Sequence, residues 1–160
     1  RQGFIYRLAF TYLDYAEAEN EAHDDASART SALEYLNLIR ERAGVRKYTF
    51  DNVPIQDDNF IHIDNTQAAL RKVIRAERRV ELCFEDNRWY DIRRWKEAEN
   101  LPEITGDGYG MNALGNSEDT FYKRTVFQHR IWKLQYYWMP VYIDEYEKNP
   151  NLVQGPFWGD

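Results

Sequence analysis

The chain has 160 residues, a formal net charge of −6 and a hydrophobic content of 43%. This length fits one domain or a piece of one, and no stretch approaches the ~20 apolar residues of a membrane-spanning helix. The acidic balance argues against a nucleic-acid partner, because phosphate neutralisation needs clustered, accessible Lys and Arg. The arginines between Arg71 and Arg94 do cluster, but they alternate with acids, so salt-bridged helices explain them better.

The first 44 residues predict an antiparallel helical hairpin. Apolar residues recur at helical spacing from about Gly3 to Asn20, and a second helix starts near Ser27. Gly44 is suited to the left-handed position after its last turn. A hairpin of this size is typical of one tetratricopeptide unit, which normally stacks on neighbours. We therefore expect apolar surface to be exposed along it.

Residues 66–98 predict a helix pair after a loop over residues 45–65. Asn65 or Thr66 can cap a long helix from Gln67 to about Glu85. Its expected apolar stripe comprises Leu70, Val73, Ile74, Val80 and Phe84. Asp86-Asn87 interrupts the pattern, and a fourth helix is expected from Trp89 to Ala98, stopped by Pro102.

Residues 99–160 predict a loop-rich tail. Four glycines and several Asp and Asn residues between Glu103 and Thr120 indicate a flexible loop. The stretch from Phe121 to Met139 mixes aromatic and basic residues and has room for short strands. One or two helical turns are expected from Ile143 to Lys148.

Glu77, Glu81 and Glu85 share one helix face, because they are spaced four residues apart. They suit either a metal or acid–base site, or a network of ion pairs. The ion-pair interpretation is favoured, since a di-metal bundle needs Glu-x-x-His partners that His23, His62 and His129 do not provide. Its expected arginines are Arg78, Arg79, Arg88 and Arg93.

No pattern in the chain predicts a catalytic residue, a cofactor site or a metal site. Two carboxylates suffice for glycoside hydrolysis, but among 27 acidic residues no pair stands out. The acids between Asp51 and Asp64 match no calcium loop and are expected to be solvated. Cys83 lies in an apolar stretch and is expected to be a buried, inert thiol.

Aromatic residues make up 16% of the chain. A Tyr or Trp offers a flat apolar face with a polar handle, which suits the surface of a sugar. Trp89 and Trp95 lie on a helix face and are expected in the core. The loop aromatics Tyr109, Phe121 and Tyr122 are the candidate ligand-binding residues.

Three segments resemble the SusD/RagB family in the expected order. They are Arg7–Ala18 (RLAFTYLDYAEA) with its partner Ala32–Val45, the central Ile74–Trp95 (IRAERRVELCFEDNRWYDIRRW), and the tail from Tyr136 to Trp158. The tail has Met139-Pro140-Val141 where the family tends to have Pro-Ile-Pro, a difference of packing rather than chemistry. Together the segments span nearly the whole chain.

The resemblance implies an all-α fold with tetratricopeptide-like hairpins and long irregular loops. It implies a non-catalytic surface lipoprotein that captures nutrients, mostly glycans, as a lid over a TonB-dependent transporter of the SusC type. It also implies that residues 1–160 are the C-terminal portion of a longer protein. The chain opens on Arg1 without Met, and the outer-membrane lipid anchor would belong to the missing N-terminus.

Three functions follow as hypotheses. The first is binding of an oligosaccharide or polysaccharide by aromatic stacking, followed by hand-over to the transporter. The second is a helical module that grips a protein or peptide, including a peptide-importing member of the same family. The third is a glycoside hydrolase. Binding without cleavage separates the first from the third.

Overall fold

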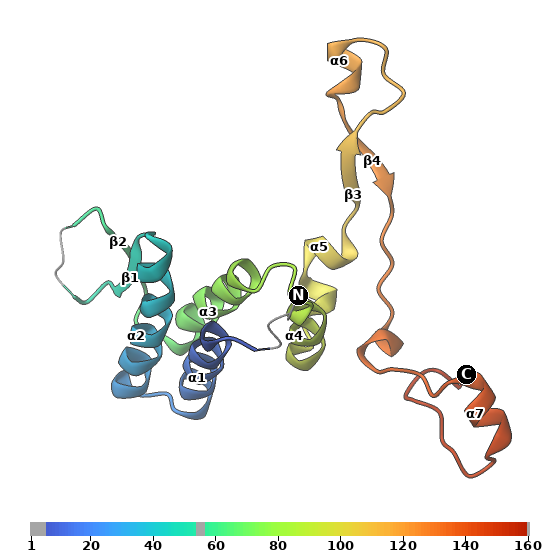
Figure 1. Ribbon diagram of the computed structural model, residues 1–160, viewed down its shortest axis with the longest axis horizontal. Helices are drawn as coiled ribbons and strands as arrows, with labels where there is room; N and C mark the ends of the chain where they lie inside the picture. Colours follow the sequence, from blue (N-terminus) through green and yellow to red (C-terminus); the bar gives the residue numbers. More distant parts are fainter. Residues whose placement is uncertain (1–5, 54–56, 160) are drawn as a thin grey trace. The chain divides into compact units, whose positions relative to one another are not determined.

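The computed structural model describes residues 6–53 and 57–159, and the chain forms two compact units, Arg1–Arg88 and Trp89–Asp160. Helices dominate the described residues, so the predicted all-α class is confirmed (Figure 1). Each unit has its own cluster of buried apolar side chains.

Three helices build the first unit: α1 (Leu8–Ala22), α2 (Ala26–Ala43) and α3 (Gln67–Glu81). The predicted hairpin of α1 and α2 is confirmed, and α3 packs against both (Figure 1). Part of the expected first helix, residues 3–5, lies outside the described residues. Asp25 caps α2 by accepting a 2.9 Å hydrogen bond from the Ala28 N–H. Gly44 ends α2 at φ 69°, a conformation that favours glycine.

The core of this unit lies where the three helices meet. The apolar residues spaced along each helix turn inward here, which explains why these segments fold as amphipathic helices. Its largest fully buried apolar side chains are Leu13, Leu36, Leu70 and Ile74. The outer surface of the hairpin keeps Leu8, Tyr15 and Leu38 exposed, so the expected apolar surface along the hairpin is present.

The expected loop over residues 45–65 contains two short strands, which corrects the prediction. β1 (Lys47–Phe50) and β2 (Phe60–Ile63) pair in parallel, with Lys47 opposite Phe60 and Phe50 opposite Ile63. Their aromatic and β-branched residues suit a strand. The side-chain amide of Asn37, on α2, also holds β1 by bonding both the N–H and the carbonyl of Tyr48, each at 2.8 Å.

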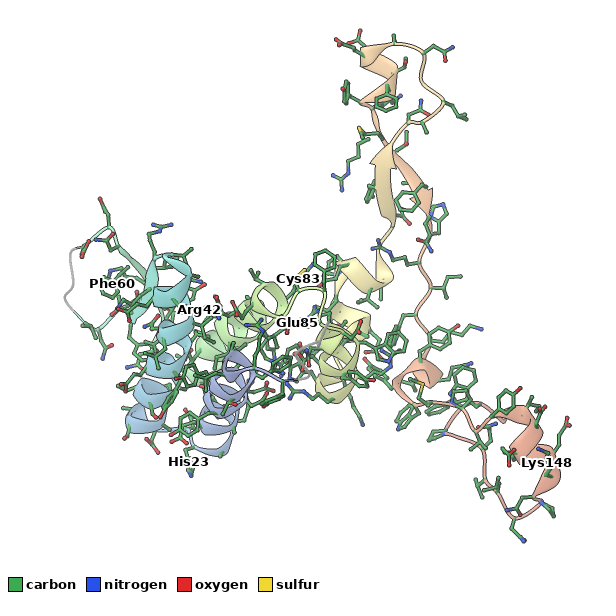
Figure 2. All side chains as sticks on the ribbon, in the orientation of Figure 1. His23, Arg42, Phe60, Cys83, Glu85 and Lys148 are labelled. Carbon is green, nitrogen blue, oxygen red and sulfur yellow. The ribbon has the colours of Figure 1, made fainter. Side chains whose placement is uncertain are left out.

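The third helix is shorter than expected, and the prediction of its apolar stripe was wrong at two of its five residues, Val80 and Phe84. It ends at Glu81, and Phe84 and Asp86 that follow have φ values of 64° and 62°. Phe84 therefore leaves the helical spacing and is fully exposed, and Val80 also faces solvent. Cys83, expected to be buried, is an exposed free thiol in the same turn (Figure 2). Thr66 is the cap, accepting from the Ala69 N–H at 3.2 Å.

Ion pairs replace apolar contacts along the second half of α3. Arg40 Nη1 lies 2.5 Å from Glu77 Oε2, and Arg78 Nη1 lies 2.5 Å from Asp14 Oδ1. Arg78 Nε also lies 3.7 Å from Glu17 Oε2. The side chains of Glu77 and Arg78 are both buried, so these pairs join α3 to α2 and α1 in a site largely shielded from water.

The same row continues to the end of α3 and beyond it. Arg7 pairs with Glu81, and its Nη2 lies 2.6 Å from Glu85 Oε1. Arg42, at the end of α2, lies 2.5 Å from Glu81; Arg42 and Glu85 are labelled in Figure 2. The ion-pair interpretation of the three glutamates is thus confirmed. The ion-pair partners of these glutamates include Arg7, Arg40 and Arg42, which were not among the arginines expected from the sequence.

These pairs predict a loss of stability in acid. Burial raises the pKa of Glu81, but hydrogen bonds from Arg7 and Arg42 outweigh burial, so the pKa lies below its ordinary value of about 4.5. A carboxyl whose pKa is lowered by folding stabilises the fold above that ordinary value, and the contribution is lost as pH falls through the folded pKa. We expect the free energy of unfolding to decrease as the pH is lowered below about 4.5.

Urea unfolding at pH 7 and pH 3.5, followed by far-ultraviolet circular dichroism, measures this loss. Glu81→Gln should flatten the pH dependence and cost about 1–3 kcal/mol at pH 7, since it leaves two arginines with a neutral partner. Glu34→Gln, at an exposed position of α2, is the control. An unchanged pH dependence in Glu81→Gln would contradict the assignment.

The second unit starts with α4 (Asn87–Trp95), whose first two residues precede the unit boundary, and continues through short elements. These are a 3-10 turn (η1, Ala98–Asn100), α5 (Pro102–Thr105), β3 (Gly108–Met111), α6 (Glu118–Phe121), β4 (Arg124–Gln128), a second 3-10 turn (η2, Leu134–Tyr137) and α7 (Ile143–Lys148). The predicted turns at Ile143–Lys148 are confirmed as α7, and the predicted short strands as β4.

Two predictions in this unit were wrong. Pro102 does not stop the fourth helix: α4 ends at Trp95 with Lys96 at φ 52°, and Pro102 begins α5 at a position where its missing N–H costs nothing. The stretch from Glu103 to Thr120 is not one flexible loop. It contains β3, which pairs with β4 antiparallel, and α6 between the two strands (Figure 1).

Candidate functional site

An aromatic cavity of about 590 Å³ lies within the second unit. This volume is within the ~300–1,000 Å³ typical of small-ligand sites. Four of the five tryptophans of the chain line it, together with Tyr136: Trp89, Trp132, Trp138 and Trp158. The walls come from α4, from Ile104 of α5, from the segment 128–140 that includes η2, and from the end of the tail. We call it the tryptophan cavity.

Helix α4 places Trp89 and Arg93 on one side of the cavity. The two residues are four apart, so they lie on the same helix face. The Arg93 guanidinium carbon lies 3.1 Å from the centre of the Trp89 ring and 5.4 Å from that of Trp132. Arg93 Nη1 also donates a 3.0 Å hydrogen bond to the Trp89 carbonyl. The guanidinium is therefore fixed against the aromatic wall.

Tyr137 anchors the aromatic run from Trp132 to Trp138 to the core of this unit. Its hydroxyl accepts a 3.0 Å hydrogen bond from the Ala98 N–H and donates to the Glu99 carboxylate. Burial and the bond to Glu99 both raise the pKa of this hydroxyl, which therefore stays protonated. The ring packs edge-on against Trp132 at 5.1 Å. With Tyr137 turned inward, its neighbours Tyr136 and Trp138 line the cavity.

The tail closes the cavity by folding back on the aromatic run. Trp158 Nε1 donates to the carbonyls of Gln135 at 2.9 Å and Trp138 at 3.1 Å. The side chain of Gln154 bonds both backbone groups of Val141, at 2.6 and 3.1 Å. A Cβ added at Gly155 would lie 3.0 Å from the Met139 carbonyl oxygen, so glycine permits this close approach.

The polar part of the lining is basic. It holds Arg93, Arg130, His129 and Gln128, while none of the lining residues is Asp or Glu. Arg130 Nη1 donates to the Glu103 carbonyl at 2.8 Å, and His129 Nδ1 lies 2.7 Å from Asp107 Oδ1. Burial lowers the pKa of Arg93, although arginine remains charged at physiological pH.

The three predicted ligand-binding residues do not line this cavity. Tyr109 lies on β3, is 48% exposed, and has the Arg124 guanidinium carbon 4.0 Å from its ring centre. Phe121 and Tyr122 lie at the end of α6, with their rings edge-on at 5.3 Å. All three side chains are accessible, and their role in binding stays a prediction.

The sequence did not reveal the cavity, because Trp89 was expected in the core and the loop aromatics Tyr109, Phe121 and Tyr122 were expected to bind the ligand. Trp89, expected to be buried, is 49% exposed, and Trp95 is only partly buried. The usable signals were the aromatic run from Trp132 to Trp138 and the four-residue spacing of Trp89 and Arg93. Neither shows by itself which ring faces a cavity.

The described residues give no support for a metal or a membrane span. Across residues 6–53 and 57–159, no three His, Cys, Asp or Glu side chains gather closely enough to hold a metal ion. None of the helices in these two stretches has the length and apolar character needed to cross a bilayer.

Comparison with protein-family models decides the family: the SusD family model matches residues 1–158. The chain belongs to the SusD family. Two curated relatives come from Formosa agariphila. SusD-like protein P2 is 37% identical over 108 residues, and SusD-like protein P25 is 34% identical over 91 residues. The aligned parts are 68% and 57% of this chain, but only 18% and 15% of the two relatives.

Solved structures confirm the SusD-like fold. BT4246 matches with a TM-score of 0.73 and 31% identity, over 96% of this chain and 24% of that protein. A SusD-like protein (BF3747) from Bacteroides fragilis matches with a TM-score of 0.69 and 31% identity, over 96% of this chain and 25% of that one. The SusD-family chain thus spans about a quarter or less of each relative, and the predicted all-α, tetratricopeptide-like class holds.

Proposed function

We propose that a protein carrying this chain binds a nutrient glycan at the cell surface and delivers it to a SusC-like, TonB-dependent outer-membrane transporter. The tryptophan cavity is the observation that carries the proposal. Family membership supports a nutrient-binding role at the outer membrane. In this proposal an N-terminal lipid holds the protein on the extracellular face, and residues 1–160 form its C-terminal part.

Indole faces suit sugars for a physical reason. A pyranose has an apolar face of C–H groups and an edge of hydroxyls, and a tryptophan presents a flat apolar ring with one N–H donor. Trp89, Trp132 and Trp138 line one cavity of a size that accepts one or two sugar units. Gln128 and the basic residues at its rim supply donors for hydroxyl oxygens.

Binding is proposed to be non-catalytic. Glycoside hydrolysis commonly uses two carboxyl groups placed across the scissile bond. The lining of the tryptophan cavity contains no Asp or Glu, so a sugar held there meets no such pair. The glycoside hydrolase hypothesis therefore has no support from this cavity.

A second candidate function is a helical module that binds a protein or peptide, including a peptide-importing member of the family. The exposed apolar residues of the α1–α2 hairpin, Leu8 and Leu38, favour it, because they flank a small groove with Tyr12 and Ile39. Such a groove suits an apolar side chain rather than a sugar.

The test is a glycan array with the full-length protein, followed by a tryptophan fluorescence titration with each hit. Binding at the tryptophan cavity should shift the emission, because four of five tryptophans line it. Incubation with the bound glycan should release no reducing ends. Peptide capture without any glycan binding would favour the second candidate, and released reducing ends would favour the hydrolase.

A further inference from the structure

The tryptophan cavity differs in charge from the rest of the chain. The chain carries 27 Asp and Glu against 21 Lys and Arg. The cavity lining reverses this balance, with Arg93 and Arg130 and no carboxylate among the lining residues. A ligand entering here therefore meets positive charge on aromatic walls, although the protein as a whole is acidic.

Arg93 differs from several arginines of the first unit in having no carboxylate partner among the described residues. Arg7, Arg40 and Arg71 each have a carboxylate within 2.6 Å. Within residues 6–53 and 57–159, no carboxylate lies within ion-pair distance of Arg93; its partners are the Trp89 carbonyl and the two indole rings. Burial lowers its pKa without a neighbouring charge to offset the loss of water.

Two buried donors at this wall lack an acceptor. Arg93 Nε and Trp132 Nε1 are both covered by protein atoms and have no hydrogen-bond partner among the described residues. They belong to neighbouring groups, since the Arg93 guanidinium carbon lies 5.4 Å from the Trp132 ring centre. Buried donors without acceptors are rare in folded proteins, because each loses its bond to water without replacement. The protein thus supplies no acceptor for these two donors, and because both atoms are covered, a ligand in the cavity would act on the charge of Arg93 rather than bond to them directly.

We infer that the tryptophan cavity selects an anionic sugar, stacking its ring on Trp89 and Trp132 and binding its oxyanion at Arg93, with Arg130 as a second cation. This inference rests on the proposed function. A uronic-acid carboxylate or a sulfate ester supplies several acceptor oxygens and no donor, which matches the planar fork of a guanidinium. A neutral sugar places only hydroxyls there and leaves the Arg93 charge uncompensated.

Calorimetric titration of the full-length protein with matched ligands tests the inference. The carboxylate arm compares trigalacturonic acid with its methyl ester, and the sulfate arm compares a sulfated galactan tetrasaccharide with its desulfated form. We expect at least one anionic ligand to bind about tenfold or more tightly than its neutral match, because charge-assisted bonds are roughly twice as strong as neutral ones. That preference should shrink at high salt.

Arg93→Gln should abolish the preference for the anionic ligand, because it removes the charge while the glutamine amide still offers a hydrogen-bond donor to a neutral sugar. Arg124→Gln is the matched control, since Arg124 also stacks on an aromatic ring but lies on β4 beside Tyr109, outside the cavity lining. If circular dichroism shows that Arg93→Gln does not fold, the inference is tested instead with Arg130→Gln and with the salt dependence of binding by the native protein.

The outcomes separate this inference from the proposed function. Equal affinity for charged and neutral ligands overturns the inference and leaves glycan binding in place. Failure to bind any of the four sugars, with no hit on the array, overturns both. A preference that survives Arg93→Gln, or tighter binding of a triglutamate peptide than of either anionic sugar, also overturns the inference.

Discussion

Arg78→Met should lower the free energy of unfolding of the first unit by about 3 kcal/mol. Arg78 is only 5% exposed, and its guanidinium lies 2.5 Å from Asp14 and 3.7 Å from Glu17. Asp14 is half exposed and can regain water, whereas Glu17 is buried and would lose its contact with Arg78. Most of the loss therefore comes from the buried side of the pair, because removing one partner of a buried ion pair is costly.

Urea unfolding of the full-length protein at pH 7 measures this loss. Arg46→Met is the control, since Arg46 is an exposed arginine after α2 and its replacement should change stability by less than about 0.5 kcal/mol. The double variant Arg78→Met/Glu17→Gln should lose less than the sum of the single variants, because it removes both charges. Additive losses, or a native-like Arg78→Met, would show that the pair does not hold α3 to α1.

The central motif shows how far the sequence predicts the fold. The spacing of Glu77, Glu81 and Glu85 correctly predicted ion pairs, but only Glu77 and Glu81 lie on α3, which ends before Glu85. The partners were harder to predict, because they depend on how α1 and α2 dock on α3 rather than on spacing within one helix. Arg7 and Arg40 lie 74 and 37 residues from their glutamates, so no local pattern connects them.

The short strands β1 and β2 were not predicted, for a different reason. β1 and β2 have four residues each, too few for an alternating pattern to stand out from a loop rich in Asp and Asn. β1 is also held by the Asn37 amide, a contact across the chain that no local propensity describes. Phe84 illustrates the opposite error: the helical period was extended four residues beyond Glu81, where the helix had already ended.

The candidate site was the least predictable part. Trp89 and Trp95 were expected on a buried helix face, but the apolar residue of α4 that is buried is Ile92, which packs with Tyr137 and Ala98. A nine-residue helix can turn a narrow face to a small core and leave its large rings at the edge. The cavity then forms from residues 89–93, 128–140 and 158, which only the folding back of the tail brings together.

Trp89→Ala should weaken binding of a neutral glycan by about tenfold or more, equal to about 1.4 kcal/mol, if the tryptophan cavity is the binding site. Trp89 is the most exposed of the four lining tryptophans, with the Arg93 guanidinium against one face of its ring, so a sugar would stack on the ring surface that Arg93 leaves uncovered. A neutral ligand isolates stacking from the charge of Arg93, whose position also depends on Trp89. Calorimetric titration measures the change.

Trp95→Ala is the matched control, because Trp95 lies on the same helix and is the one tryptophan of the chain outside the cavity lining. It should leave the glycan affinity within about twofold, equal to about 0.4 kcal/mol, provided circular dichroism shows both variants folded. Equal weakening in the two variants would mean that the loss comes from disturbing α4. If only Tyr109→Ala weakened the glycan affinity, the binding site would instead lie at the β3–β4 hairpin, as the sequence analysis expected.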